Sequence, residues 1–265
     1  MSTPLDALFL KTRSENRAAL IGYLPAGFPS LQGCTDALTA MVEGGVDAVE
    51  IGYPYSDPVM DGPVIQAAAE TSLRNGTGAA DVMATLGTIS KIAPTVVMTY
   101  WNPIEKYGVD NFLANIKKNG GSGVITPDLT IEESELWINA STIHGTNRIY
   151  VVAPSSSQER LKKVTASTSG FVYAASLMGV TGTRATISSS AHLLVSRLRE
   201  VTDLPIAVGL GVSTPEQAHE VAQYADGVIV GSAFIRLLQE ANSPQEGISQ
   251  VRALAQALSK GLIRS

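Results

Sequence analysis

Eight short apolar runs, rich in β-branched residues, recur along the 265-residue sequence and alternate with segments of helical character. Short runs that are apolar throughout are typical of parallel strands covered on both faces. The segments between them, such as 36–45 and 216–225, place small and apolar residues on one helical face. The expected strands are residues 18–26, 48–55, 95–101, 123–129, 148–154, 170–176, 205–211 and 227–233.

This alternation predicts an α/β fold, a (β/α)8 TIM barrel. Successive runs begin 22 to 47 residues apart, which is close to the ~30 residues of one βα unit. An open doubly wound sheet is the competing architecture, but it usually has fewer strands and one glycine-rich turn after the first. Here the glycines gather after the last three runs. We expect one domain over residues 1–265, because no linker or low-complexity segment divides the chain.

Three segments add to the eight-unit pattern. Residues 4–13 are expected to form an extra N-terminal helix that closes the bottom of the barrel. The long interval after the second run has room for a loop and for an extra helix over 64–76, which Gly76 ends. Residues 177–190, after the sixth run, are rich in small and polar residues and are expected to form a second long loop. Long loops in compact domains are usually functional.

Composition excludes several classes of protein. The net charge is −5, the pI is about 5.3 and no Lys/Arg cluster occurs, so neither nucleic acid nor a membrane is an expected partner. Residues 1–17 contain no signal peptide, and no apolar run approaches the ~20 residues of a membrane span. A single cysteine, Cys34, allows no internal disulfide and fits a cytoplasmic protein. The three histidines lack the spacing of metal ligands, so we expect no metal site.

Three glycine-containing stretches follow the last three expected strands, at residues 179–182, 209–213 and 230–233. Active sites of (β/α)8 barrels lie where strands end, commonly with a phosphate site after the last two strands. Glycine lets backbone N–H groups approach an anion closely, and a following helix N-terminus adds its dipole. One stretch alone would fit an ordinary tight turn, but three at one rim favour a phosphate-binding site.

A carboxylate interrupts the second apolar run. Glu50 lies within residues 48–55, and Asp57 and Asp61 follow in the loop. A strand carboxylate can pair with a buried cation, but we expect no cation on the other strands to serve as its partner. An unpaired carboxyl group in apolar surroundings has a raised pKa and can both give and take a proton. Glu50 is therefore a candidate catalytic residue, whereas Asp57 and, taken alone, Asp61 fit solvated turn residues.

The sequence around these carboxylates, VEIGYPYSDPVMDGPVIQ at 49–66, resembles that of the tryptophan synthase alpha subunit family. The matches run in order from residue 18 to residue 233, and so cover nearly the whole chain. The resemblance implies cleavage of indole-3-glycerol phosphate to indole and glyceraldehyde 3-phosphate, a reverse-aldol reaction. The other matching segments are PAGFP at 25–29, MTYWNP at 98–103, Tyr173, GVTG at 179–182, GLGVS at 209–213 and VGSA at 230–233.

The resemblance also implies roles for single residues. Cleavage requires a proton on the indole ring carbon, loss of a hydroxyl proton from the side chain, and stabilisation of positive charge at the ring nitrogen. Glu50 corresponds to the family's proton-transfer residue, and Asp61 to the carboxylate that faces the ring nitrogen. The other implied residues orient or bind the substrate: Tyr173 and Thr181 orient it, Gly182, Gly211, Gly231 and Ser232 bind its phosphate, and Tyr100 and Leu210 complete the binding set.

The family's partner is a beta subunit, which carries pyridoxal phosphate and consumes the indole in an α2β2 heterotetramer. No cofactor is therefore expected on this chain.

Several positions depart from the usual family pattern and affect the pocket and the loop rather than the reaction. Gly22 replaces an aromatic residue that often lines the indole pocket, and Leu210 replaces a common phenylalanine. The other departures from the pattern are Tyr53, Leu177 and Met178.

Three other functions share parts of this pattern. They are an epimerase or isomerase of phosphorylated sugars, a subunit that only activates or tethers a partner, and a stand-alone lyase that releases indole. The pair Glu50 and Asp61 in its specific loop argues against the first, and the presence of both carboxylates argues against the second. The third differs from an alpha subunit in the turnover expected of the isolated chain.

Overall fold

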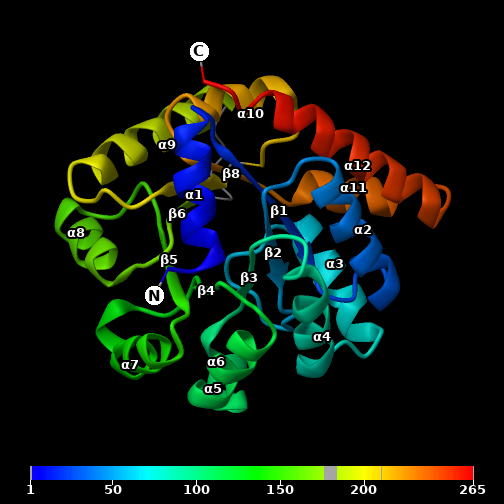
Figure 1. Ribbon diagram of the computed structural model, residues 1–265, viewed down its shortest axis with the longest axis horizontal. Helices are drawn as coiled ribbons and strands as arrows, with labels where there is room; N and C mark the ends of the chain where they lie inside the picture. The colour runs from blue at the N-terminus through cyan, green and yellow to red at the C-terminus, as the bar shows by residue number, and fades with distance from the viewer. Residues whose placement is uncertain (1, 176–183, 210, 265) are drawn as a thin grey trace.

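A closed parallel β-barrel forms the centre of the computed structural model, which describes residues 2–175, 184–209 and 211–264 (Figure 1). Over these residues the strands pair in chain order, and the last strand pairs with the first. The predicted TIM barrel is confirmed, although the expected runs extend beyond the strands into the loops. The strands are β1 (Ala19–Pro25), β2 (Ala48–Gly52), β3 (Thr95–Met98), β4 (Gly123–Thr126), β5 (Asn147–Val152), β6 (Val172–Ala175), β7 (Ile206–Gly209) and β8 (Gly227–Val230).

Helices form a ring around the barrel and cover the outer faces of the strands (Figure 1). Among the helices in the described part of the chain, none combines the length and the apolar character needed to cross a membrane. The ring contains α2 (Leu31–Glu43), α4 (Ala79–Ile89), α5 (Trp101–Tyr107), α6 (Val109–Lys118), α7 (Glu135–His144), α8 (Gln158–Ser167), α9 (Arg184–Arg199), α10 (Pro215–Ala222), α11 (Ser232–Glu240) and α12 (Pro244–Lys260).

Two segments test the expectations for long intervals. The extra helix after the second strand is present as α3 (Pro63–Arg74), with a proline in the first turn, where the missing N–H costs no hydrogen bond. The loop expected over 177–190 is shorter than predicted, because α9 already begins at Arg184. This helix packs on β6 and β7, and such tertiary packing overrides the modest helix propensity of its serine and threonine residues.

Helix α1 (Pro4–Ser14) closes the N-terminal end of the barrel, as the sequence predicts, and Figure 1 shows it lying across that opening. Leu5 and Phe9 are buried in one apolar cluster with the inward-facing residues of the strands. Asn147 at the start of β5 donates a hydrogen bond to the Thr3 hydroxyl at 2.9 Å, which ties the helix start to the barrel. The opposite end of the barrel therefore remains available for a site.

Asp226 joins distant segments at this closed end. It is 8% exposed and accepts a hydrogen bond from the Ile206 N–H at 2.9 Å. Its carboxylate also pairs with Arg199 at the end of α9, with Arg264 at 3.4 Å and with Arg13 at 3.9 Å. One buried carboxylate thus links α1, α9, the start of β7 and the C-terminal segment.

We expect Asp226→Ala to lower the free energy of unfolding by about 3 kcal/mol, because it leaves a buried N–H without an acceptor and three guanidinium groups without their shared counter-ion. Asp226→Asn keeps the shape and an acceptor oxygen and should cost less. Urea unfolding measures both. Asp203→Ala, which changes an exposed carboxylate nearby, is the control; a loss as large as that of Asp226→Ala would contradict the prediction.

Candidate active site

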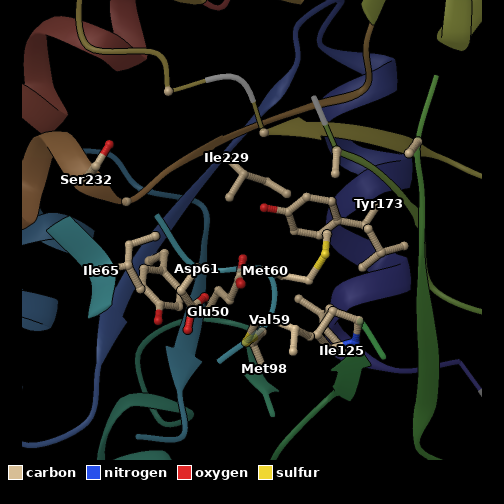
Figure 2. Close-up of a pocket in the computed structure, with 18 residues that line it drawn as sticks. Glu50, Val59, Met60, Asp61, Ile65, Met98, Ile125, Tyr173, Ile229 and Ser232 are labelled. Carbon is tan, nitrogen blue, oxygen red and sulfur yellow. The ribbon is translucent and has the colours of Figure 1, made fainter. Parts of the chain in front are cut away.

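A cavity of about 220 Å³ opens at the carboxyl ends of the strands, at the end of the barrel opposite α1 (Figure 2). Strand ends, the loop after β2, and the segments after β7 and β8 line it. Its polar side chains include two carboxyl groups and two tyrosines, set in mostly apolar walls. A surface of this kind suits a flat apolar ring that a few polar groups orient. The apolar walls include Val59, Ile65, Met98, Ile125, Val151 and Ile229.

Glu50 points into this cavity from β2. Side chains alternate along a strand, so Glu50 faces the barrel interior while Val49 and Ile51 pack in the outer apolar layer. Glu50 is 3% exposed, and its Oε2 atom has no hydrogen-bond partner among the described residues. Burial, and secondly the charge of Asp61, raises the pKa of Glu50 to about 8. Glu50 therefore keeps its proton at neutral pH and can donate it.

Arg148, at the start of β5, is a strand cation, but it does not serve as the partner of Glu50. Its guanidinium donates to the Ser167 carbonyl at 3.1 Å and to the Ser141 hydroxyl at 3.0 Å. These partners lie in α8 and α7, in the outer ring of helices. Within the described residues no ion pair neutralises Glu50.

Asp61 reaches the same cavity from the loop after β2. Burial raises the pKa of Asp61 to about 6, and a hydrogen bond from Tyr100 opposes this shift. Figure 2 shows the side chains of Asp61 and Glu50 close together at the cavity. Two carboxyl groups with separated pKa values can hold opposite protonation states. Near neutral pH the proton is on Glu50 and the negative charge is on Asp61.

Tyr100 holds the loop that carries Asp61. Its side chain is buried behind the loop, and its hydroxyl accepts a hydrogen bond from the Met60 N–H at 3.1 Å. Nearby, Asn102 donates to the Tyr55 hydroxyl at 2.8 Å. Burial and the charge of Asp61 raise the pKa of Tyr100 to about 12. Tyr100 is not among the residues that line the cavity, and its hydroxyl contacts the loop.

Two tyrosines enter the cavity from opposite sides of the barrel. Tyr173, expected from the sequence, projects from β6 (Figure 2), and Tyr23, not expected, projects from β1. Burial and the charges of Glu50 and Asp61 raise the pKa of both phenols well above the ordinary range. Both hydroxyl groups therefore remain hydrogen-bond donors over the working pH range.

Gly22 does not line the pocket, and the expectation that placed it there is wrong. A Cβ at this position would meet Met41 and Val46, at 3.0 and 3.3 Å, on the outer side of β1. The aromatic residue that β1 contributes to the cavity is its neighbour Tyr23, because one step along a strand changes the face. Side chains alternate between the two faces along the first apolar run, so Gly22 and Tyr23 must face opposite ways, and this alternation distinguishes the two positions. Tyr53, another departure, is half-buried outside the cavity lining.

Gly211, Gly231 and Ser232 line the side of the cavity at β7 and β8. Ser232 begins α11, and Gly231 precedes it. Gly211 has a φ of 68°, and a Cβ there would meet no atom within 4 Å, so its backbone borders open space. A helix N-terminus and exposed backbone at one rim can hold an anion. Five positions named from the sequence lie outside the described residues: Leu177, Met178, Thr181, Gly182 and Leu210.

Other reactive side chains lie apart from this cavity. Cys34 is buried in α2, and burial raises the pKa of its thiol to about 12. His144 pairs with Asp110 at 2.8 Å between α7 and α6. In the part of the chain that the structure describes, no group of three or more His, Cys, Asp or Glu side chains could hold a metal ion.

Sequence comparisons place this geometry among known proteins. The model of the family described as "Tryptophan synthase alpha chain" matches residues 9–262. The tryptophan synthase alpha chain of Streptomyces coelicolor is 54% identical over 260 residues, which are 97% of this chain and 96% of that protein. The corresponding chain of Thermobifida fusca is 52% identical over 264 residues, 98% of each chain.

Solved structures show the same likeness. A structure of Mycobacterium tuberculosis tryptophan synthase matches with a TM-score of 0.93 and 48% identity, over 100% of both chains. The tryptophan synthase subunit alpha of Legionella pneumophila matches with a TM-score of 0.89 and 30% identity, over 98% of both chains. A family match over nearly the whole chain, with relatives more than half identical, shows that this chain belongs to the tryptophan synthase alpha chain family.

Proposed function

We propose that this chain cleaves indole-3-glycerol phosphate to indole and glyceraldehyde 3-phosphate, with Glu50 as the acid–base group and Asp61 as the charge stabiliser. The observation that carries this proposal is the pair of carboxyl groups in one apolar cavity. Their pKa values are raised to about 8 and about 6, so the two groups suit opposite roles at neutral pH. Family membership supplies the substrate and the products.

Glu50 carries out both proton transfers. Its carboxyl group first gives a proton to the indole ring carbon that bears the side chain, and positive charge develops on the ring nitrogen. The carbon–carbon bond then breaks, and its electron pair restores the aromatic ring. The hydroxyl on the departing carbon loses its proton to the Glu50 carboxylate and becomes the aldehyde, so Glu50 returns to its starting state.

Asp61 stabilises the charge that develops between these steps. As a carboxylate it faces the ring N–H, and its attraction for the cationic ring is stronger in an apolar cavity than in water. The hydrogen bond from the Met60 N–H to Tyr100 holds the loop in place while this charge develops. Tyr173 and Thr181 orient the ring between the two carboxyl groups.

The glycines after the last strands bind the phosphate of the substrate. Gly211, Gly231 and Ser232 border the cavity, and the N-terminus of α11 adds a partial positive charge. Gly182 and Leu210 also bind the substrate. The phosphate fixes the far end of the substrate, so the ring must lie toward the apolar wall and the carboxyl groups.

A tryptophan synthase beta chain is the proposed partner, in an α2β2 assembly with pyridoxal phosphate on the beta chain. The support lies in the loop after β2, where Val59 is 72% exposed and Met60 is 41% exposed, beside the cavity. These apolar side chains belong to the segment that carries Asp61. A partner that covers them would stabilise the loop over the cavity and exclude water from the reaction.

Glu50→Gln should lower kcat for indole release by at least ~100-fold, because the shape is kept and the proton is lost. Asp61→Asn should also lower kcat, with a smaller change in KM, since its charge is needed mainly in the transition state. Steady-state indole release measures both. Asp57→Asn, on the exposed part of the same loop, is the control and should remain near wild type. A Glu50→Gln enzyme within a few-fold of wild type would refute the assignment.

The pH dependence of kcat/KM should have two limbs. Glu50 must be protonated, so activity should fall as the pH rises through its pKa of about 8. Asp61 must be ionised, so activity should also fall as the pH drops below about 6. Asp61→Asn should remove the acid limb and move the alkaline limb to lower pH, because the Asp61 charge contributes to the raised pKa of Glu50. An alkaline limb unchanged in that variant would contradict the coupling.

Adding a beta chain should raise kcat by roughly 5–150-fold, the range of ordinary allosteric coupling. Asp57→Ala, at the exposed outer turn of the loop, should keep the activity of the isolated chain and blunt this activation. Asp203→Ala, an exposed carboxylate at the other end of the barrel, is the matched control. Full activation of the Asp57→Ala variant would show that the loop does not transmit the signal, and a wild-type chain that is fast alone and not activated would be a stand-alone lyase.

A further inference from the structure

Tyr23 is the polar side chain of the cavity that has no role in the mechanism above. It is 6% exposed and lies on β1, where it is the register partner of Glu50 on β2. Paired residues on neighbouring strands project from the same face of a sheet. Both side chains therefore enter the barrel next to each other, and both line the cavity.

Two glycines leave space for the Tyr23 side chain. A Cβ at Gly52 would lie 2.4 Å from the Tyr23 hydroxyl oxygen, and a Cβ at Gly231 would lie 2.8 Å from its Cδ1 atom. Gly52 follows Glu50 by two residues on the same strand, so it has the same inward direction. The hydroxyl is thus held one step beyond Glu50, toward the mouth of the cavity.

Few donors face Glu50 in the described part of the chain. Asp61, from the loop, is an acceptor when ionised, and Tyr100 beside it is engaged with Asp61. Tyr173 approaches from β6, and Tyr23 approaches from β1. A buried carboxylate without donors is strongly unfavourable, yet the reaction requires Glu50 to ionise once in every cycle. A phenol held beside it meets that requirement.

We propose that Tyr23 is a positioning residue for Glu50, and that its hydroxyl donates a hydrogen bond to the carboxylate that forms when Glu50 has passed its proton to the substrate. Because the two residues are register partners and the hydroxyl lies beside Gly52, two residues beyond Glu50 on the same strand, the carboxylate and the hydroxyl belong to one side of the cavity. Tyr23 keeps its own proton throughout. The bond stabilises the ionised form of Glu50 and directs it at the substrate hydroxyl that it must deprotonate.

The catalytic consequence rests on the proposed function, but the hydrogen bond itself does not, so the first test needs no turnover. Chain labelled with ¹³C at the glutamate carboxyl carbons is titrated by NMR, and Glu50 is assigned by the signal that Glu50→Gln removes. The wild-type midpoint should lie near the pKa of about 8. Tyr23→Phe should move this midpoint up by about one pH unit, since it removes a donor to the charged form.

Tyr150→Phe is the matched control, because Tyr150 is a buried strand tyrosine that packs in the outer apolar layer. It should leave the Glu50 midpoint unchanged. A Glu50 midpoint that is the same in Tyr23→Phe as in wild type would overturn the proposal. Gly52→Ala is a second variant, because its added methyl group would meet both the hydroxyl and the ring edge of Tyr23 and must displace that side chain. It should raise the midpoint as Tyr23→Phe does, and an unchanged midpoint would count against the proposal.

Indole release then tests the consequence for catalysis. In Tyr23→Phe the alkaline limb of kcat/KM should move up with the Glu50 midpoint, and kcat should fall about tenfold with little change in KM. If Tyr23→Phe shifts the midpoint but the wild-type chain releases no indole, the hydrogen bond stands and the proposed function is refuted. Normal indole release with an unshifted midpoint would refute the role of Tyr23 and leave the proposed function standing.

Discussion

The parallel register between β1 and β2 is the constraint on which the site depends. It places Glu50 beside Tyr23 and turns both into the barrel, where both side chains are largely buried. Burial in that setting raises the pKa of Glu50 to about 8. A slip of one residue would exchange Glu50 for Val49 or Ile51 and place the carboxyl group among the helices. The raised pKa of Glu50 therefore depends first on the pairing of the strands and only secondly on single contacts in the cavity.

Glycines shape the cavity because they have no side chain and leave space for the tyrosines. Gly52 and Gly231 make room for Tyr23, and Gly209, whose Cβ would lie 2.6 Å from the Tyr173 hydroxyl, makes room for that phenol. These glycines lie at or just beyond strand ends, where a side chain would point into the barrel. The large inward tyrosines on β1 and β6 therefore lie next to glycines on or just after the neighbouring strands. Gly211, whose Cβ would meet no atom within 4 Å, keeps backbone accessible at the rim where an anion is expected to bind.

The two ends of the barrel serve different purposes. At the amino ends of the strands, α1 fills the opening, and Asp226 joins several segments through charged hydrogen bonds. At the carboxyl ends, a loop with exposed apolar side chains carries Asp61 over the cavity. The contacts that stabilise the barrel therefore lie at one end and the site at the other.

The sequence by itself determined the eight-strand barrel, its extra helices α1 and α3, and Glu50 as a candidate, because apolar periodicity and a charge within an apolar run are local properties; Asp61 was named only through the family resemblance. The tertiary structure decided the rest. It showed that Tyr23 rather than Gly22 faces the cavity, that Tyr100 lies behind the loop, and that α9 begins earlier than the composition of its segment indicates. It also separated the pKa values of Glu50 and Asp61, since a pKa depends on the groups that distant segments bring around a carboxyl, and no local pattern records them.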